Sequence, residues 1–428
     1  MEFLLIIISI LYLFYIIMCW KYVFREPTNI TFIVSALNVF FYFVPAWAWV
    51  LGKKNFSYVS EYFIPFVGER DSRILFIIST LIGFAFLIGG IAGHLSYKRQ
   101  FEQIVIPNKT KYYNTALIIL YSLWAFIVII VYRSSNTTFL TFLAPISSSI
   151  NMGSGYIKNL YLAVPITIIS LQYARNLKFT KLSVVTIFIC TLLFLATGQR
   201  RDVASLAIFL GSIIYFTKYR KETSLRLKQK IRVLLLGFIS ISMIPVMWWL
   251  RSWFTQKNAG NLTAIKPWEN RGFLEIIFGG QASGFPTLLL IEDWVSHTVT
   301  NWFYSFKYLA GIIVPRSLWE GKYIDPDSLI QKEYFLTTDP SLFLINEMYL
   351  NFKIFAIPFA FIFGFILSRI HRKLFCTNSI LHKAYLAVLF SNVIALFKNG
   401  FSVFFINATF MIVIIQLFYK VSFTSSES

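Results

Sequence analysis

The sequence is poor in charged residues, cysteine and histidine. Of its 428 residues, 14% are charged, three are cysteine and four are histidine. Soluble domains carry roughly 25% charged residues, so a chain of this size and composition could not cover a water-facing surface. Cys19, Cys190 and Cys376 lie far apart, inside or beside apolar segments. The sequence therefore supports neither a disulfide framework nor a zinc site.

Motifs for nucleotide, metal and serine-hydrolase chemistry are also missing. The chain has no Gly-x-x-x-x-Gly-Lys-Ser/Thr, no Gly-x-Gly-x-x-Gly, no His-Glu-x-x-His and no Gly-x-Ser-x-Gly. These absences argue against ATP-driven transport and metalloprotease chemistry. His94, His297, His371 and His382 show no metal-ligand spacing. We therefore expect neither a cofactor nor a metal ion.

The chain is instead rich in apolar and aromatic residues. Hydrophobic residues make up 57% of it, and it contains 46 Phe, 23 Tyr and 11 Trp, which excludes disorder. Because a helix needs about 20 apolar residues to cross a bilayer, we expect an all-α, polytopic integral membrane helix bundle of about 11 transmembrane helices. The first lacks a basic start and a cleavage site and is expected to be retained. The expected spans are 2–20, 30–51, 74–96, 115–132, 159–173, 182–197, 203–217, 233–250, 354–368, 384–397 and 401–420.

Basic residues between these spans predict the orientation. The odd-numbered loops hold 20 Lys or Arg in 65 residues, whereas the even-numbered loops hold 18 in 159. Lys and Arg are retained on the cytoplasmic side of short loops, so the odd loops are predicted to be cytoplasmic and the N-terminus to lie outside. This distribution also explains the net charge of +20 without nucleic acid as a partner.

The orientation divides the chain into three expected regions. Residues 1–250 form an N-terminal bundle of about eight spans, and 354–428 form a C-terminal bundle of about three. Between them, 251–353 is a large outer loop with helical or re-entrant segments and a nearly neutral balance of 9 basic and 10 acidic residues. A loop of this length usually has a function.

Basic residues at the predicted outer face are candidates for binding an anion. Arg200 and Arg201 lie in the short outer segment Thr197-Gly-Gln-Arg-Arg-Asp202, and guanidinium groups match phosphate oxygens bidentately. Asp202 could instead neutralise one of them within a topogenic turn. Further candidates are Arg251, Arg316 and Lys322, with Trp319 as a surface for stacking on sugar rings; interfacial anchoring is the alternative for Arg251 and the aromatic residues.

Several carboxylates in the same loop are candidates for a general base. Glu347 stands out because it lies near the start of the segment that leads from the outer loop back into the membrane, Asn346-Glu-Met-Tyr-Leu-Asn351. A carboxylate paired with Arg200 or Arg316 is the alternative interpretation. The other candidates are Glu292, Asp293, Glu320, Asp325 and Asp327.

Three of these segments resemble the Wzy-type O-antigen polymerases, or oligosaccharide repeat unit polymerases. They are Thr197–Asp202 at an outer edge, Ile313-Val-Pro-Arg-Ser-Leu-Trp-Glu-Gly-Lys322 in the large loop, and Glu347-Met-Tyr-Leu-Asn-Phe352 before a late span. The architecture of many spans and one long periplasmic loop agrees over nearly the whole length. Some members are described by an Arg and a Gly with ten residues between them, a spacing that Arg200 and Gly211 fit. Lys353 departs from the family, in which a Gly often follows the Asn-Phe pair.

The resemblance implies a multi-pass enzyme of the bacterial inner (cytoplasmic) membrane with its active site facing the periplasm. It would join undecaprenyl-diphosphate-linked oligosaccharide repeat units into polysaccharide, for lipopolysaccharide biosynthesis, by glycosyl transfer from the growing chain to the incoming unit. Arg200 and Arg201 would hold the donor diphosphate, and Glu347, or failing that Asp293, would orient or deprotonate the acceptor. The expected substrate-binding residues are Arg251, Arg316, Lys322, Asp202 and Trp319. A chain-length regulator and a flippase are the partners expected besides the lipid-linked substrates and the bilayer.

Three other classes fit parts of the sequence. An O-antigen ligase would use the same donor and a similar fold. A lipid-linked oligosaccharide flippase or another secondary transporter would show pseudo-repeated halves and charges at mid-membrane, whereas the charges here cluster at one face and favour an enzyme. A membrane acyltransferase would need a placed His or His-Asp pair, which the sequence does not show.

Overall fold

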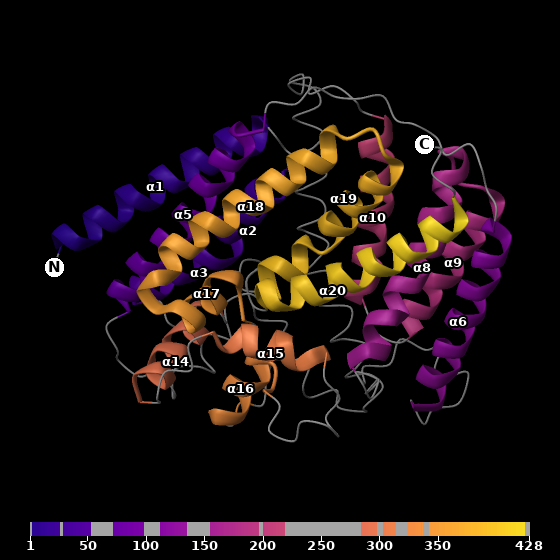
Figure 1. Cartoon of the computed structure of the whole chain (residues 1–428). Coiled ribbons are helices and arrows are strands. Elements are labelled where there is room, and N and C mark those ends of the chain that lie inside the picture. Colours follow the sequence, from indigo (N-terminus) through magenta and orange to yellow (C-terminus); the bar gives the residue numbers. More distant parts are fainter. Residues whose placement is uncertain are drawn as a thin grey trace, which may run out of the picture. The chain divides into compact units, whose positions relative to one another are not determined.

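The computed structural model describes residues 2–25, 29–52, 72–97, 112–134, 155–196, 200–218, 284–297, 303–313, 323–334, 336 and 342–423. Helices account for almost all of this part of the chain, and it contains no β-strand (Figure 1). The helices are α1 (Glu2–Arg25), α2 (Ile30–Asn38), the π-helix η1 (Val39–Phe43), α3 (Val44–Val50), α5 (Arg73–Leu95), α6 (Tyr113–Ser134), α8 (Gly155–Asn176), α9 (Lys181–Ala196), α10 (Arg200–Lys218), α14 (Gly284–His297), α15 (Tyr304–Ile313), α16 (Pro326–Glu333), α17 (Leu344–Phe352), the 3₁₀ turn η3 (Lys353–Phe355), α18 (Ala356–Cys376), α19 (Ile380–Ser391) and α20 (Val393–Ser422).

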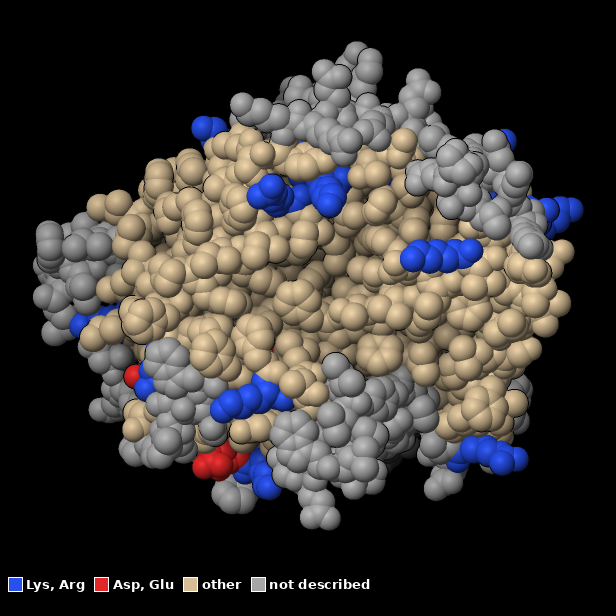
Figure 2. All heavy atoms as spheres, viewed as in Figure 1, with Lys and Arg blue, Asp and Glu red and all other residues tan. Residues whose placement is uncertain are grey.

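Five helical segments within the described ranges are long and apolar enough to cross a membrane. They are Ile30–Val50, Arg73–Leu95, Tyr113–Arg133, Leu344–Cys376 and Val393–Ser422. Shorter apolar helices lie at Ile10–Tyr22, Lys181–Phe194, Asp202–Thr217 and Ile380–Ser391. The described part of the chain is thus all-helical, and the chain is a polytopic membrane protein. Figure 2 shows wide areas of surface without charged side chains, as lipid-facing helices require. The predicted count of eleven spans stays a prediction, and the span at 233–250 lies outside the described residues.

The helix boundaries near the C-terminus differ from the predicted ones. The sequence predicts spans at 384–397 and 401–420 with a loop between them, whereas α19 ends at Ser391 and α20 runs from Val393 through a kink at Gly400. The Ser391 hydroxyl and the Asn392 amide both donate to the Val388 carbonyl, at 2.8 and 2.9 Å. Polar side chains that bond nearby backbone compete with the helical ladder, so the helix breaks here although the apolar run continues.

The described residues belong to two compact units. Unit 1 comprises Met1–Lys98, Thr223–Arg372 and Val393–Phe404, and unit 2 comprises Arg99–Glu222, Lys373–Asn392 and Phe405–Ser428. The helices α18 and α20 each contribute residues to both units. The three regions expected from the sequence divide the chain by membrane topology, which these units do not test, so that division stays a prediction.

Unit 1 is built around α2, η1, α3 and α5. Asn29 begins α2, since its Oδ1 accepts the Thr31 N–H at 3.0 Å, and its Nδ2 donates to Ser368 Oγ of α18 at 2.9 Å. Pro45 lacks an N–H and cannot donate to the helical ladder. The chain accommodates it with the preceding π-helix η1, at the end of which the Val44 N–H donates to the Val39 carbonyl. Figure 1 shows α14, α15 and α16 together at the end of this unit where α17 meets α18.

Glycines bring α5 and α18 of unit 1 into direct backbone contact. A Cβ on Gly89 or Gly93 would overlap the carbonyls of Phe361 or Phe365, and one on Gly364 would overlap the Phe86 carbonyl. Small residues four positions apart allow such close approach of membrane helices, whose association is driven by van der Waals packing. This contact fixes α18, and therefore the C-terminal end of α17, against the core of the unit.

Unit 2 combines an aromatic core with polar links between its helices. Phe216 of α10 packs with Phe375 and Leu386. The Tyr121 hydroxyl of α6 lies 2.6 Å from Thr186 Oγ1 of α9 and accepts the Gln172 amide of α8 at 2.9 Å. Such hydrogen bonds join membrane helices because lipid offers polar groups no other partner.

Candidate functional site

The short helix α17 carries polar side chains into the core of unit 1. Every residue from Leu344 to Phe352 is buried, although Asn346, Glu347 and Asn351 are polar. Burying a polar group costs free energy unless it is hydrogen-bonded. These three side chains therefore define the region of the described chain where a functional site is best supported.

Glu347 lies directly against a break in α20. Its side chain is 0% exposed, and Oε2 accepts the Ser402 backbone N–H at 3.2 Å. The hydroxyls of Ser305 and Ser402 also lie beside the carboxylate. Its second oxygen, Oε1, is buried and makes no hydrogen bond within the described part of the chain.

The break is caused by Gly400, whose backbone has φ 81° and ψ −176° inside α20. Glycine alone adopts this conformation readily. A second helical segment begins after it, and its first free N–H groups point toward the Glu347 carboxylate. The N-terminal end of a helix carries partial positive charge, so the break stabilises this carboxylate.

Asn346 fixes the other side of α17. Its Oδ1 accepts the Tyr42 hydroxyl of η1 at 2.8 Å, and its Nδ2 donates to the Gly284 carbonyl of α14 at 2.6 Å. These bonds tie α17 to η1 and to the start of α14.

Four other carboxylates of the predicted outer loop have local structural partners. Asp325 caps α16 by accepting the Asp327 and Ser328 N–H groups, and Asp327 accepts the Leu342 N–H at 2.6 Å. The Tyr349 hydroxyl donates to Glu292 at 2.6 Å, and the Tyr334 hydroxyl donates to Asp293 at 2.8 Å. These contacts favour structural roles and leave Glu347 as the described carboxylate best placed for chemistry. Glu320 lies outside the described residues.

The predicted arginine pair begins α10. Arg200 and Arg201 are the first two residues of this helix, and Asp202, in its first turn, is 3% exposed. The side chains of Arg200 and Arg201 lie outside the described part of the structure. This turn belongs to unit 2, whereas Glu347 belongs to unit 1. A Cβ on Gly211, the glycine that is separated from Arg200 by ten residues, would meet nothing within 4 Å, so packing does not require glycine there.

The remaining predicted substrate-binding residues lie outside the described residues; they are Arg251, Arg316, Trp319 and Lys322. The sequence did not single out Ser305, Gly400 or Ser402 as parts of a site. An Asn399-Gly400 pair inside a long apolar stretch is a signal for a broken membrane helix, whereas the apolar pattern alone predicts a loop between two spans there. Within the ranges that the structure covers, no group of three His, Cys, Asp or Glu side chains is placed to bind a metal ion.

The helices and the buried polar site define a polytopic membrane protein with a broken helix at a carboxylate. The chain matches the family described as O-antigen polysaccharide polymerase Wzy over residues 1–314. It belongs to this family, whose members are polymerases and thus catalyse glycosyl transfer. Glu347 and Gly400 lie beyond the matched residues. No curated protein and no solved structure matches the chain.

Proposed function

We propose that the protein elongates O-antigen polysaccharide at the periplasmic face of the bacterial inner membrane. The donor is the growing glycan on undecaprenyl diphosphate, and the acceptor is a single lipid-linked repeat unit. The observation that carries this proposal is the family match over residues 1–314. The low content of Lys and Arg in the outer loops relative to the inner ones supports the orientation.

In this proposal the Arg200–Asp202 turn binds the donor diphosphate. Two guanidinium groups at the N-terminal end of a 19-residue helix add to the partial positive charge of the helix end, which favours phosphate. Arg251, Arg316 and Lys322 would add positive charge, and Trp319 would stack on a sugar. Donors aimed at charge that develops in the transition state stabilise it without a metal ion.

Glu347 is the proposed base of the reaction. The acceptor hydroxyl oxygen bonds to the anomeric carbon of the donor, and the bond from that carbon to the diphosphate oxygen breaks. The bonding electron pair leaves with the diphosphate, and the hydroxyl proton goes to the carboxylate. Oε2 is occupied by the Ser402 N–H, so Oε1 is the oxygen that receives the proton.

The burial of Glu347 has a consequence for this mechanism. Because the carboxylate is 0% exposed, an acceptor hydroxyl reaches it only after a covering segment moves. Movements that complete a catalytic site when the substrate binds are common in enzymes that must exclude water. Water would otherwise hydrolyse the lipid-linked glycan.

The direct test uses the purified full-length protein in nanodiscs. Lipid-linked repeat units are added without nucleotide, and the products are separated by size. We expect a ladder of products that each differ by one repeat unit. If folded protein leaves the repeat units unchanged, the proposal is wrong. A deletion strain separates the polymerase from a ligase, because loss of the polymerase leaves single repeats on the cell surface and loss of a ligase leaves none.

A further inference from the structure

Asn351, at the C-terminal end of α17, joins the helix that carries Glu347 to the start of α15. Its side chain is 1% exposed. Oδ1 accepts the Ser305 backbone N–H at 2.8 Å, while Nδ2 donates to Ser305 Oγ at 2.9 Å and to the Glu347 backbone carbonyl at 2.6 Å. Both amide hydrogens and the carbonyl oxygen are therefore in use.

The direction of these bonds has a consequence for the Ser305 hydroxyl. Because Asn351 Nδ2 donates to Ser305 Oγ, the hydroxyl keeps its own proton for a different acceptor. The carboxylate of Glu347 lies beside that hydroxyl. Asn351 thus holds Glu347 directly at its backbone carbonyl and also fixes the Ser305 hydroxyl that lies beside the Glu347 carboxylate.

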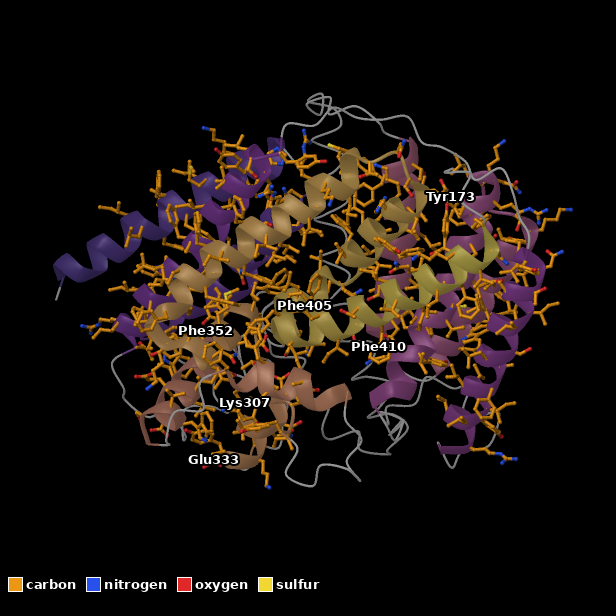
Figure 3. All side chains as sticks on the ribbon, in the orientation of Figure 1. Tyr173, Lys307, Glu333, Phe352, Phe405 and Phe410 are labelled. Carbon is orange, nitrogen blue, oxygen red and sulfur yellow. The ribbon has the colours of Figure 1, made fainter. Side chains whose placement is uncertain are left out.

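Two further hydrogen bonds fix the start of α15, the segment that carries Ser305. The Phe303 N–H donates to the Asn351 carbonyl at 3.4 Å, and the Tyr304 hydroxyl donates to the Ile324 carbonyl at 3.1 Å. Burial raises the pKa of Tyr304 to about 12, so this hydroxyl remains a donor at neutral pH. Figure 3 shows Phe352 beside this region and Lys307 on α15.

We infer that Asn351 is a positioning residue for glycosyl transfer, which it serves by fixing Glu347 through Ser305 and through the last turn of α17. The inference rests on the proposed role of Glu347 and assigns a function to a residue outside the predicted site. Misplacing a reacting group by about 1 Å can cost about 10²-fold in rate. The loss expected for Asn351→Ala is of that order in kcat, with KM for the lipid-linked acceptor nearly unchanged.

Asn346 provides a matched control on the same helix. It is also a buried asparagine, and its two side-chain hydrogen bonds, against three for Asn351, go to Tyr42 and Gly284 and not to Glu347 or Ser305. Asn346→Ala and Asn351→Ala should therefore lower thermal stability to a similar degree. A merely structural role for Asn351 predicts that both variants also retain similar turnover per folded molecule.

The test is a double-mutant cycle on the full-length protein in nanodiscs, with turnover normalised to folded protein. Glu347→Gln alone should lower kcat by about 10² to 10⁴-fold, the contribution of a general base. In that background Asn351→Ala should cause no further loss, because the group it positions no longer acts. Ser305→Ala, which keeps the backbone bond to Asn351, should give a smaller loss in kcat that Glu347→Gln likewise masks.

The outcomes separate the two proposals. If Glu347→Gln keeps full turnover, the proposed base is wrong and the role of Asn351 falls with it. If Glu347→Gln is slow but Asn351→Ala retains turnover, or if their losses multiply, only the positioning role is overturned. If Asn351→Ala does not fold, the cycle is run with Ser305→Ala in its place. Losses from Ser305→Ala and Glu347→Gln that multiply would then contradict the inference.

Discussion

The carboxylate of Glu347 occupies the space that a side chain at Gly400 would need. A Cβ at position 400 would overlap Oε2 and lie 2.8 Å from Cδ of Glu347, and the backbone there has φ 81°. The kink in α20 and the buried carboxylate are therefore one structural feature. Broken helices in membrane proteins bind anionic groups in the same way, at the N-terminal end of a helix segment.

Gly400→Ala should therefore lower the yield of folded protein and its melting temperature. Backbone strain of about 1–3 kcal/mol adds to the overlap with Glu347. Gly211→Ala is the control, because its Cβ would meet nothing within 4 Å in a helix, and we expect it to be neutral or to stabilise by about 0.5–1 kcal/mol. Glu347→Ala should partly rescue Gly400→Ala. An equally stable Gly400→Ala protein would show that this arrangement is incorrect.

Gly89 should tolerate alanine far less well than Gly83 on the same helix. A Cβ at Gly89 would overlap the Phe361 carbonyl of α18, whereas one at Gly83 would lie 3.2 Å from the Phe43 ring, which can shift. We expect Gly89→Ala to separate α5 from α18 and to lower the melting temperature in detergent, with a smaller loss for Gly83→Ala. Equal melting temperatures for the two variants would contradict the packing of α5 on α18.

Lys353→Gly should stabilise the protein. Lys353 follows α17 with φ 50° and ψ −124°, a conformation that favours glycine. Replacing it with glycine should raise stability by up to about 1 kcal/mol. Lys353→Ala loses the same 3.5 Å contact to the Val295 carbonyl but keeps the strain. The prediction fails if glycine and alanine give the same melting temperature.

Arg200→Ala and Arg201→Ala should lower turnover by about 10² to 10³-fold, the effect of removing one donor that stabilises transition-state charge. Expression in membranes should stay normal. Lys218→Ala, at the other end of the same helix, is the control and should retain turnover because it is predicted to face the cytoplasm. Long polysaccharide chains from either arginine variant would exclude the proposed diphosphate site.

Lys332→Cys and Lys178→Cys should differ in their reaction with a membrane-impermeant maleimide. Both side chains are exposed, and the native cysteines are buried, so labelling reports the new thiols. In cells with a permeable outer membrane and an intact inner membrane, Lys332→Cys should react and Lys178→Cys should not. The reverse result would place the 251–353 region in the cytoplasm, where the proposed acceptor could not reach it.

The sequence was sufficient for features that depend on local composition. Apolar runs of about 20 residues predicted helices, because an unpaired backbone cannot cross lipid, and α1, α5 and α6 lie where those runs are. The segments around Arg200 and Glu347 also carried the resemblance to the family that the match over residues 1–314 confirms. Composition could not locate the break at Asn392, since its cause is a pair of side-chain bonds to one carbonyl.

The surroundings of Glu347 were decided by the tertiary structure alone. Ser305, Asn351 and Ser402 lie on three different helices, and sequence spacing does not predict which polar groups a fold brings together. The sequence by itself determined that the chain is a helical membrane protein, because hydropathy acts locally, and its segments carried the resemblance to the polymerase family. Only the packing of α15, α17 and α20 decided that one carboxylate is enclosed at a helix break, because a buried charge depends on partners that are distant in the chain.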